Sequence, residues 1–81
     1  MRAVATTLPE AFGTVLVRYR EQKGWTQMTL AVKAGLHLNA VSNLERGKRC
    51  PNLYTVMALS RALEVPAASL IAAVEKTDPR F

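Results

Sequence analysis

Apolar residues recur at helical spacing along most of the chain, and glycine or proline interrupts them at intervals. In the first segment the apolar positions are Phe12, Val15, Leu16 and Tyr19. This spacing predicts a helix over residues 8–23, which Gly24 ends. Thr7 and Glu10 have the Thr-x-x-Glu form of a capping box, which supports a helix start at this point.

Two short helices with a tight turn between them are predicted for the middle of the chain. Thr26 is a suitable N-cap for the first, and Gly35 permits the left-handed backbone conformation that closes it. The second should cover residues 38–46 and end at Gly47, with His37 at its N-cap. Apolar contacts between the two helices would come from Leu30, Ala34, Leu36, Val41 and Leu44, with the small Ala31 beside them. This pattern fits helices that cross at a steep angle, the geometry of a helix-turn-helix.

Two further helices complete an all-α prediction of five helices. Pro51 and Asn52 indicate a stop and a new N-cap, and Pro66 indicates the start of the fifth helix. The apolar positions are Leu53, Val56, Leu59, Ala62 and Leu63 in the fourth helix, and Leu70, Ile71 and Val74 in the fifth. The last three would face the core or a partner.

The length of the chain bounds its organisation. A chain of 81 residues, 49% of them hydrophobic, can bury one compact core and is too short for two. We expect one domain over residues 8–76, a short arm over residues 1–7 and a frayed tail over residues 77–81. No apolar run approaches the roughly 20 residues needed to span a bilayer. Cys50 is the only cysteine, so an intramolecular disulfide is excluded, and a cytoplasmic protein is expected.

The basic charge of the chain favours a polyanionic partner. Eleven Lys and Arg against six Asp and Glu give a net charge of +5 and a pI near 10.0. Charge alone does not identify nucleic acid as that partner. The clustering of Arg46, Lys48 and Arg49 directly after the second motif helix raises the expectation.

The motif residues together carry a family resemblance. They are Arg20, Gly24 to Gln27, Leu30, Ala31, Ala34 to Leu36, Val41, Ser42, Leu44 to Arg49, and Pro51. With them the chain resembles the Xre family of phage-repressor and Cro-type DNA-binding domains, over residues 12–74. The resemblance implies a phage-repressor-like fold with the helix-turn-helix at its second and third helices. It also implies a small stand-alone regulator, such as a Cro-type repressor or a restriction-modification controller protein.

The outward face of the second motif helix would read DNA bases, because Val41 and Leu44 occupy its inward face. The candidate base readers are His37, Leu38, Asn39, Ser42 and Asn43. Asn39 and Asn43 lie on one face, and an Asn amide can pair bidentately with adenine. Leu38 stands where the family usually has a polar residue. It could contact a thymine methyl group or be an ordinary exposed leucine.

A second set of residues would bind phosphate or hold the helices together. The candidate phosphate-binding residues are Gln27, Arg46, Lys48, Arg49 and Asn52. By resemblance, Gln27 would grip the DNA backbone and brace Asn39. The resemblance also implies a partly buried ion pair between Arg20 and Glu45, which ties the first helix to the end of the third.

Catalysis finds no support in the sequence. One His, one Cys and the lack of a phosphate-binding glycine loop leave no site for an enzyme, a metal or another cofactor, and no small-molecule ligand is evident.

The expected partner is double-stranded DNA, bound by a homodimer. Resemblance places the dimer interface at Val65, Ala67, Ile71 and Phe81, with Tyr54 and Met57 as alternatives. The competing interpretations are that Ile71 and Val74 only complete a monomer core, and that the chain is an antitoxin-like interaction module with secondary DNA binding.

Overall fold

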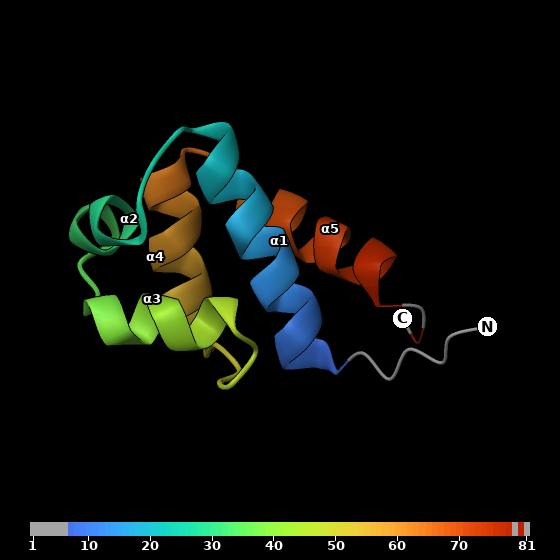
Figure 1. Cartoon of the computed structure of the whole chain (residues 1–81). Helices are drawn as coiled ribbons and strands as arrows, with labels where there is room; N and C mark the ends of the chain where they lie inside the picture. Colours follow the sequence, from blue (N-terminus) through green and yellow to red (C-terminus); the bar gives the residue numbers. More distant parts are fainter. Residues whose placement is uncertain (1–6, 79, 81) are drawn as a thin grey trace.

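The described part of the chain forms five helices, as the sequence predicts. The computed structural model describes residues 7–78 and 80, and these residues contain no strand. The helices are α1 (Leu8–Gln22), α2 (Gln27–Ala34), α3 (Leu38–Glu45), α4 (Leu53–Leu63) and α5 (Ala67–Thr77). Helix α3 packs on α1 and α2, α4 packs on α2 and α5, and α5 also packs on α1 (Figure 1). The second and third helices therefore lie against a support formed by the other three.

Capping residues set the helix starts where the sequence places them. The side-chain oxygens of Thr7, Thr26 and Asn52 each accept a backbone N–H three residues further on. At Thr7 the capping box is complete, because a Glu10 side-chain oxygen accepts the Thr7 backbone N–H. Gly35 closes α2 at φ 70° and ψ 32°, the left-handed conformation expected of it. The His37 side chain forms no capping hydrogen bond, although its backbone occupies the N-cap position.

Three helix ends differ from the prediction by one residue. Helix α1 ends at Gln22 and α3 at Glu45, each one residue before the predicted end, and Pro66 is the N-cap of α5. In α1 the last turn tightens, because the Lys23 N–H donates to the Arg20 carbonyl three residues back. Arg46 is the C-cap of α3.

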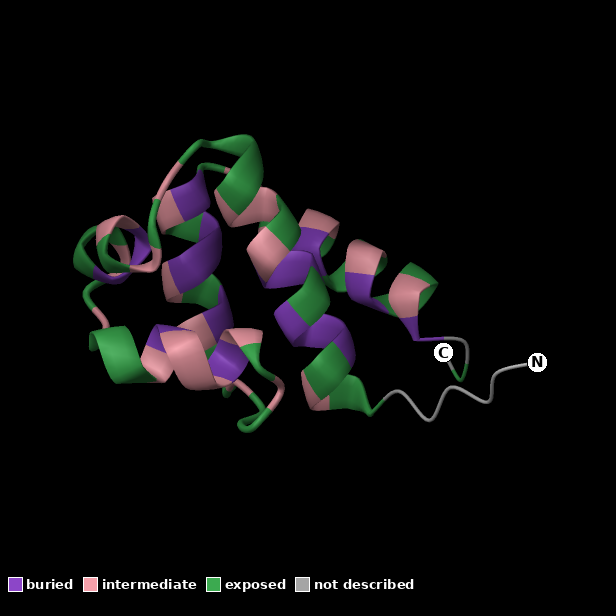
Figure 2. Ribbon diagram, in the orientation of Figure 1, coloured by how far each residue is buried: buried purple, intermediate pink, exposed green. Residues whose placement is uncertain are grey.

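The inward faces of all five helices form one core (Figure 2). Its buried residues are Ala11, Phe12, Val15, Leu16, Leu30, Ala31, Val41, Leu44, Val56, Leu59, Leu63, Leu70 and Val74. The prediction that Leu53 joins this stripe is wrong, because the first residue of α4 projects beyond the core and is 75% exposed. Ile71 is also exposed, at 47%, whereas Val74 completes the core.

No single helix among the described residues is long and apolar enough to cross a bilayer. Helices α4 and α5 together reach the length and composition of a span, but the chain bends by 109° between them. Their apolar faces, represented by Leu59, Leu63 and Leu70, are used in the core.

Asp78 and Arg80 form a local ion pair directly after α5. Asp78 is fully buried, and the Arg80 guanidinium donates to both of its carboxylate oxygens, at 2.9 and 2.6 Å. These hydrogen bonds hold the pKa of Asp78 below its ordinary value. A buried carboxylate needs such a partner. The frayed tail expected over residues 77–81 stays a prediction. Residues 1–6 of the arm predicted over residues 1–7, together with Pro79 and Phe81, lie outside the described residues.

Gly13 brings α1 unusually close to the end of α3. A Cβ atom at Gly13 would lie 2.6 Å from the backbone oxygens of both Leu44 and Glu45. Backbone atoms cannot rotate away from such a contact as a flexible side chain can. The absence of a side chain at Gly13 therefore sets the position of α3 on the support.

Replacing Gly13 by alanine should lower the free energy of unfolding by about 2 kcal/mol, as expected for an overpacked buried site. Alanine elsewhere in a helix would stabilise by up to about 1 kcal/mol relative to glycine, so the sign of the change is diagnostic. Urea denaturation measures it. The neighbouring exposed substitution Thr14→Ala is the control and should change stability by less than about 0.5 kcal/mol. A Gly13→Ala protein as stable as the original would show that α1 and α3 do not approach this closely.

Candidate nucleic-acid interface

Helix α3 presents a polar face away from the core. Val41 and Leu44 are buried on its inner side, while Asn39 is exposed and Ser42 and Asn43 are half-buried on the other. Within the described residues, no hydrogen bond engages the Asn39 side chain. Its amide is therefore available as both donor and acceptor.

His37 and Leu38 lie at the start of α3, where the turn from α2 ends. Both are exposed, and 39% of the Leu38 surface is accessible. The two alternatives for Leu38 remain open, because exposure fits a contact with a thymine methyl group and an ordinary surface leucine equally well. Three of the five candidate base readers, Asn39 included, are thus exposed.

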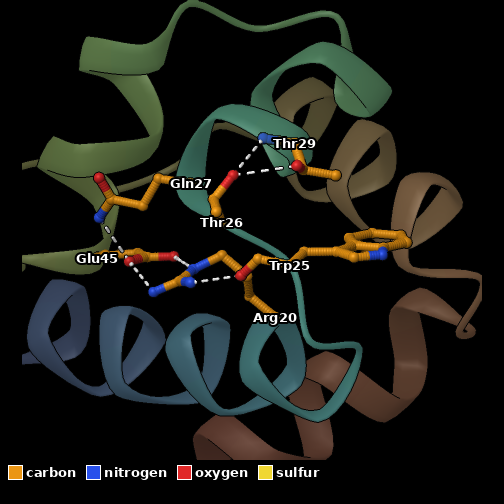
Figure 3. A network of polar contacts seen from close by, with 6 residues as sticks. All are labelled: Arg20, Trp25, Thr26, Gln27, Thr29 and Glu45. Carbon is orange, nitrogen blue, oxygen red and sulfur yellow. Dashed lines mark hydrogen bonds and ion pairs between the residues drawn. The ribbon is translucent and has the colours of Figure 1, made fainter.

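A buried polar network joins α1, α2 and α3 (Figure 3). The Glu45 side chain is only 4% exposed and accepts Arg20 Nε at 2.6 Å and Arg20 Nη2 at 3.1 Å. Arg20 Nη1 also donates to the backbone oxygen of Trp25 at 2.7 Å. The hydrogen bond to Glu45 is the largest cause that raises the pKa of Arg20, so the guanidinium stays charged. The ion pair that the family resemblance implied is present and fixes α1 to the end of α3.

Gln27 belongs to the same network. Its Nε2 donates to Glu45 Oε1 at 2.7 Å, and Figure 3 shows the amide directed at the carboxylate. No hydrogen bond joins Gln27 to Asn39 in this structure. Gln27 therefore links the start of α2 to the end of α3, a contact that the sequence did not predict. One Nε2 N–H and the backbone N–H groups of this helix start remain to meet an anion.

Trp25 packs on the edge of the core, next to two cations. Its ring is half-buried against the core, with Lys23 Nζ 5.5 Å and Lys33 Nζ 5.1 Å from the ring centroid. Trp25 therefore has a structural role, because a ring held in this way is not a free stacking surface.

Basic side chains follow α3 directly. Arg46, Lys48 and Arg49 are all exposed, and the turn that carries them is fixed by the Lys48 backbone N–H, which donates to Asn43 O at 2.9 Å. Asn52 is exposed as well, but its Oδ1 caps α4, so its side chain has a structural role. The three cations form a positive edge at the carboxyl end of the polar face.

Asn43 and Arg46 contact each other on the polar face. Arg46 Nη2 donates to Asn43 Oδ1 at 2.9 Å. The sequence predicted separate roles for them: Asn43 was a candidate base reader and Arg46 a candidate phosphate-binding residue. Their spacing of three positions on a helix was the available indication, because side chains at i and i+3 are neighbours.

The residues predicted for a dimer interface fall into different environments. Val65 and Ala67 are half-buried and pack against the core, whereas Ile71 is exposed. Tyr54 is 74% exposed and Met57 is 52% exposed, and with Val65 and Ala67 they line a shallow hollow between α2, α4 and α5. Apolar surface for a partner is therefore present on this side of the molecule.

The described residues hold no group of three or more His, Cys, Asp or Glu side chains that could bind a metal ion. The exposed Cys50 stands alone between Arg49 and Pro51.

A family of known proteins matches most of the chain. The family described as Helix-turn-helix matches residues 16–70, which include α2, α3 and the Arg20–Glu45 pair. The chain is 34% identical over 65 residues to an uncharacterized HTH-type transcriptional regulator, y4dJ, of Sinorhizobium fredii, with 80% of this chain and 84% of the relative covered.

Solved structures of restriction-modification controller proteins share the fold. C.AhdI from Aeromonas hydrophila superimposes with a TM-score of 0.75 at 35% identity, covering 76% of this chain and 94% of that chain. The C.Esp1396I controller, solved as a tetramer in complex with its natural 35 base-pair operator, gives a TM-score of 0.79 at 27% identity. That alignment covers 86% of this chain and 92% of the controller.

Proposed function

The chain belongs to the Xre-type helix-turn-helix family of transcriptional regulators, and from this premise we propose that it binds double-stranded DNA sequence-specifically as a homodimer. The observation that carries the proposal is the exposed polar face of α3, followed directly by three exposed cations. The buried Arg20–Glu45–Gln27 network holds this face rigidly on the support. A preset helix is what base readout requires, because hydrogen bonds to base edges tolerate little misplacement.

In the complex, α3 lies in the major groove and Asn39 contacts a base edge through both polar atoms of its amide, a pattern that fits adenine. Lys48 and Arg49 neutralise phosphates and set the register without reading sequence. At the start of α2, the free Nε2 N–H of Gln27 and adjoining backbone N–H groups meet a phosphate oxygen. The network around Glu45 thus connects the phosphate contact of α2 to the reading helix.

One reading helix covers only a few base pairs, which favours a dimer. Two copies placed about 34 Å apart engage successive major grooves and read a near-palindromic operator. Ile71 and the hollow lined by Tyr54, Met57, Val65 and Ala67 offer the apolar surface for this contact. C.Esp1396I binds its own operator as a tetramer, which supports assembly on DNA in this family. A DNA-binding regulator of this kind acts in the cytoplasm.

Replacing Lys48 by alanine should weaken binding to specific and random duplexes alike. The slope of log Kd against log salt should flatten by about one for each protomer bound, because one phosphate contact is lost. Fluorescence-anisotropy titrations at several salt concentrations measure this slope.

The matched control is Arg18→Ala, which removes the same charge from an exposed position on the α1–α5 side. It should leave the slope unchanged. Equal flattening by both substitutions would mean that net charge, and not a phosphate contact beside α3, determines the affinity.

A further inference from the structure

The contact between Arg46 and Asn43 determines which polar atoms α3 offers to DNA. Arg46 Nη2 lies 2.9 Å from Asn43 Oδ1, so a guanidinium donor occupies the acceptor side of this amide. Arg46 is exposed and Asn43 is half-buried, and both project from the face opposite Val41 and Leu44. The two side chains therefore form one polar unit on the proposed reading surface.

Toward a DNA base, this unit offers mainly hydrogen-bond donors. With Oδ1 directed at Arg46, Asn43 offers the two N–H groups of Nδ2, and the guanidinium of Arg46 has donors only. Bidentate pairing with adenine needs an acceptor for the adenine amino group beside a donor for N7. In this arrangement the acceptor already holds a cation, and the adenine amino group would face another donor.

Guanine has the complementary edge. Its O6 and N7 are both acceptors in the major groove, whereas adenine combines one acceptor with an amino donor. We propose that Asn43 and Arg46 act together as a donor pair that selects guanine, with Arg46 as the residue that positions the Asn43 amide. The inference rests on the proposed function. It separates the two asparagines of α3, because the Asn43 acceptor already holds a guanidinium, whereas no hydrogen bond engages the Asn39 amide among the described residues.

Selection of bound duplexes from a random library tests the proposal with four proteins: the unmodified chain and the variants Asn43→Ala, Arg46→Ala and Arg18→Ala. The position whose base preference disappears with Asn43→Ala identifies the base under Asn43. This base should be guanine in the unmodified protein, and the preference for guanine should be lost with Arg46→Ala. Arg18→Ala is the matched control: it removes an exposed arginine on the α1–α5 side, without a contact to Asn43, and should keep the guanine preference.

Base analogues give a second measurement that does not depend on the stability of any variant. 7-Deazaguanine at the identified position removes N7 and should weaken binding by about tenfold per half-site. Inosine keeps O6 and N7 and should bind as tightly as guanine. Loss with 7-deazaguanine alone supports the donor pair, whereas no loss overturns it.

The failure of the inference is distinguishable from the failure of the proposed function. An unmodified protein that enriches no sequence would contradict both. An enriched operator with adenine under Asn43, or with guanine that persists in Arg46→Ala, would overturn the donor pair and leave sequence-specific binding intact.

Discussion

Replacing Glu45 by alanine should lower the free energy of unfolding by about 3 kcal/mol, because removal of one partner of a buried ion pair leaves the other charge uncompensated. The Arg20 guanidinium would lose two hydrogen bonds to the carboxylate, and its side chain is only 14% exposed. Gln27 Nε2 would lose its partner as well. Urea denaturation followed by circular dichroism measures the change.

The exposed ion pair between Lys23 and Glu64 supplies the control. Lys23 and Glu64 approach to 3.5 Å, but the Glu64 side chain is 79% exposed, so Glu64→Gln should change stability by less than about 1 kcal/mol. Glu45→Gln keeps the shape of the side chain and removes the charge, so its cost should lie between those of Glu64→Gln and Glu45→Ala. A Glu45→Ala protein with an unchanged unfolding curve would contradict the structural role of the network.

Replacing Asn39 by alanine should leave the fold intact and reduce binding to the correct operator strongly. The side chain is exposed and without an intramolecular hydrogen bond among the described residues, so the stability should change by less than about 0.5 kcal/mol. Each contact of an Asn amide with a base contributes about 1 to 3 kcal/mol of discrimination, and a dimer makes it twice. We expect a loss of at least about tenfold, since about 1.4 kcal/mol corresponds to a factor of ten.

The measurement compares Kd values on the selected operator and on a scrambled duplex of the same composition. Asn39→Ala should lose affinity on the operator and keep its weak binding to scrambled DNA. Gln22→Ala, an exposed amide at the end of α1, is the control and should bind both duplexes like the unmodified protein. If Asn39→Ala weakens both duplexes equally, Asn39 does not read a base.

The helix-turn-helix could be predicted from the sequence because its determinants are local. Thr26 and Gly35 mark the two ends of α2 through capping chemistry that depends on neighbouring residues only. The inward positions Leu30, Val41 and Leu44 follow from helical periodicity. These features define two helices and their turn before any long-range contact is known.

Apart from the Arg20–Glu45 pair, which the family resemblance implied, the interactions that hold α3 in place could not be predicted, because they join residues far apart in the sequence. The close approach of Gly13 to the backbone of Leu44 and Glu45 depends on how α1 packs. The hydrogen bond from Gln27 to Glu45 depends on the crossing of α2 and α3. The prediction that Leu53 belongs to the core was wrong for a related reason. Helical periodicity assigns a face to a residue, but it does not show that the core ends before the first turn of α4.

The candidate site likewise combines features that the sequence predicts with a contact that it does not. Exposure of Asn39, Lys48 and Arg49 follows from their positions on α3 and the turn after it. The contact between Asn43 and Arg46 needed side-chain positions, since i and i+3 neighbours on a helix need not bond. It is this contact that changes the expected base preference at Asn43.

Selection of bound duplexes from a random double-stranded library at moderate salt, followed by sequencing, tests sequence-specific reading by α3 most directly. The expected result is an enriched inverted repeat with half-sites about 10 base pairs apart, centre to centre. Asn39→Ala should relax the preference at one symmetric pair of positions. A library without enrichment, together with binding that disappears uniformly as salt rises, would contradict sequence-specific binding. The binding would then be explained by the electrostatic attraction of a basic surface.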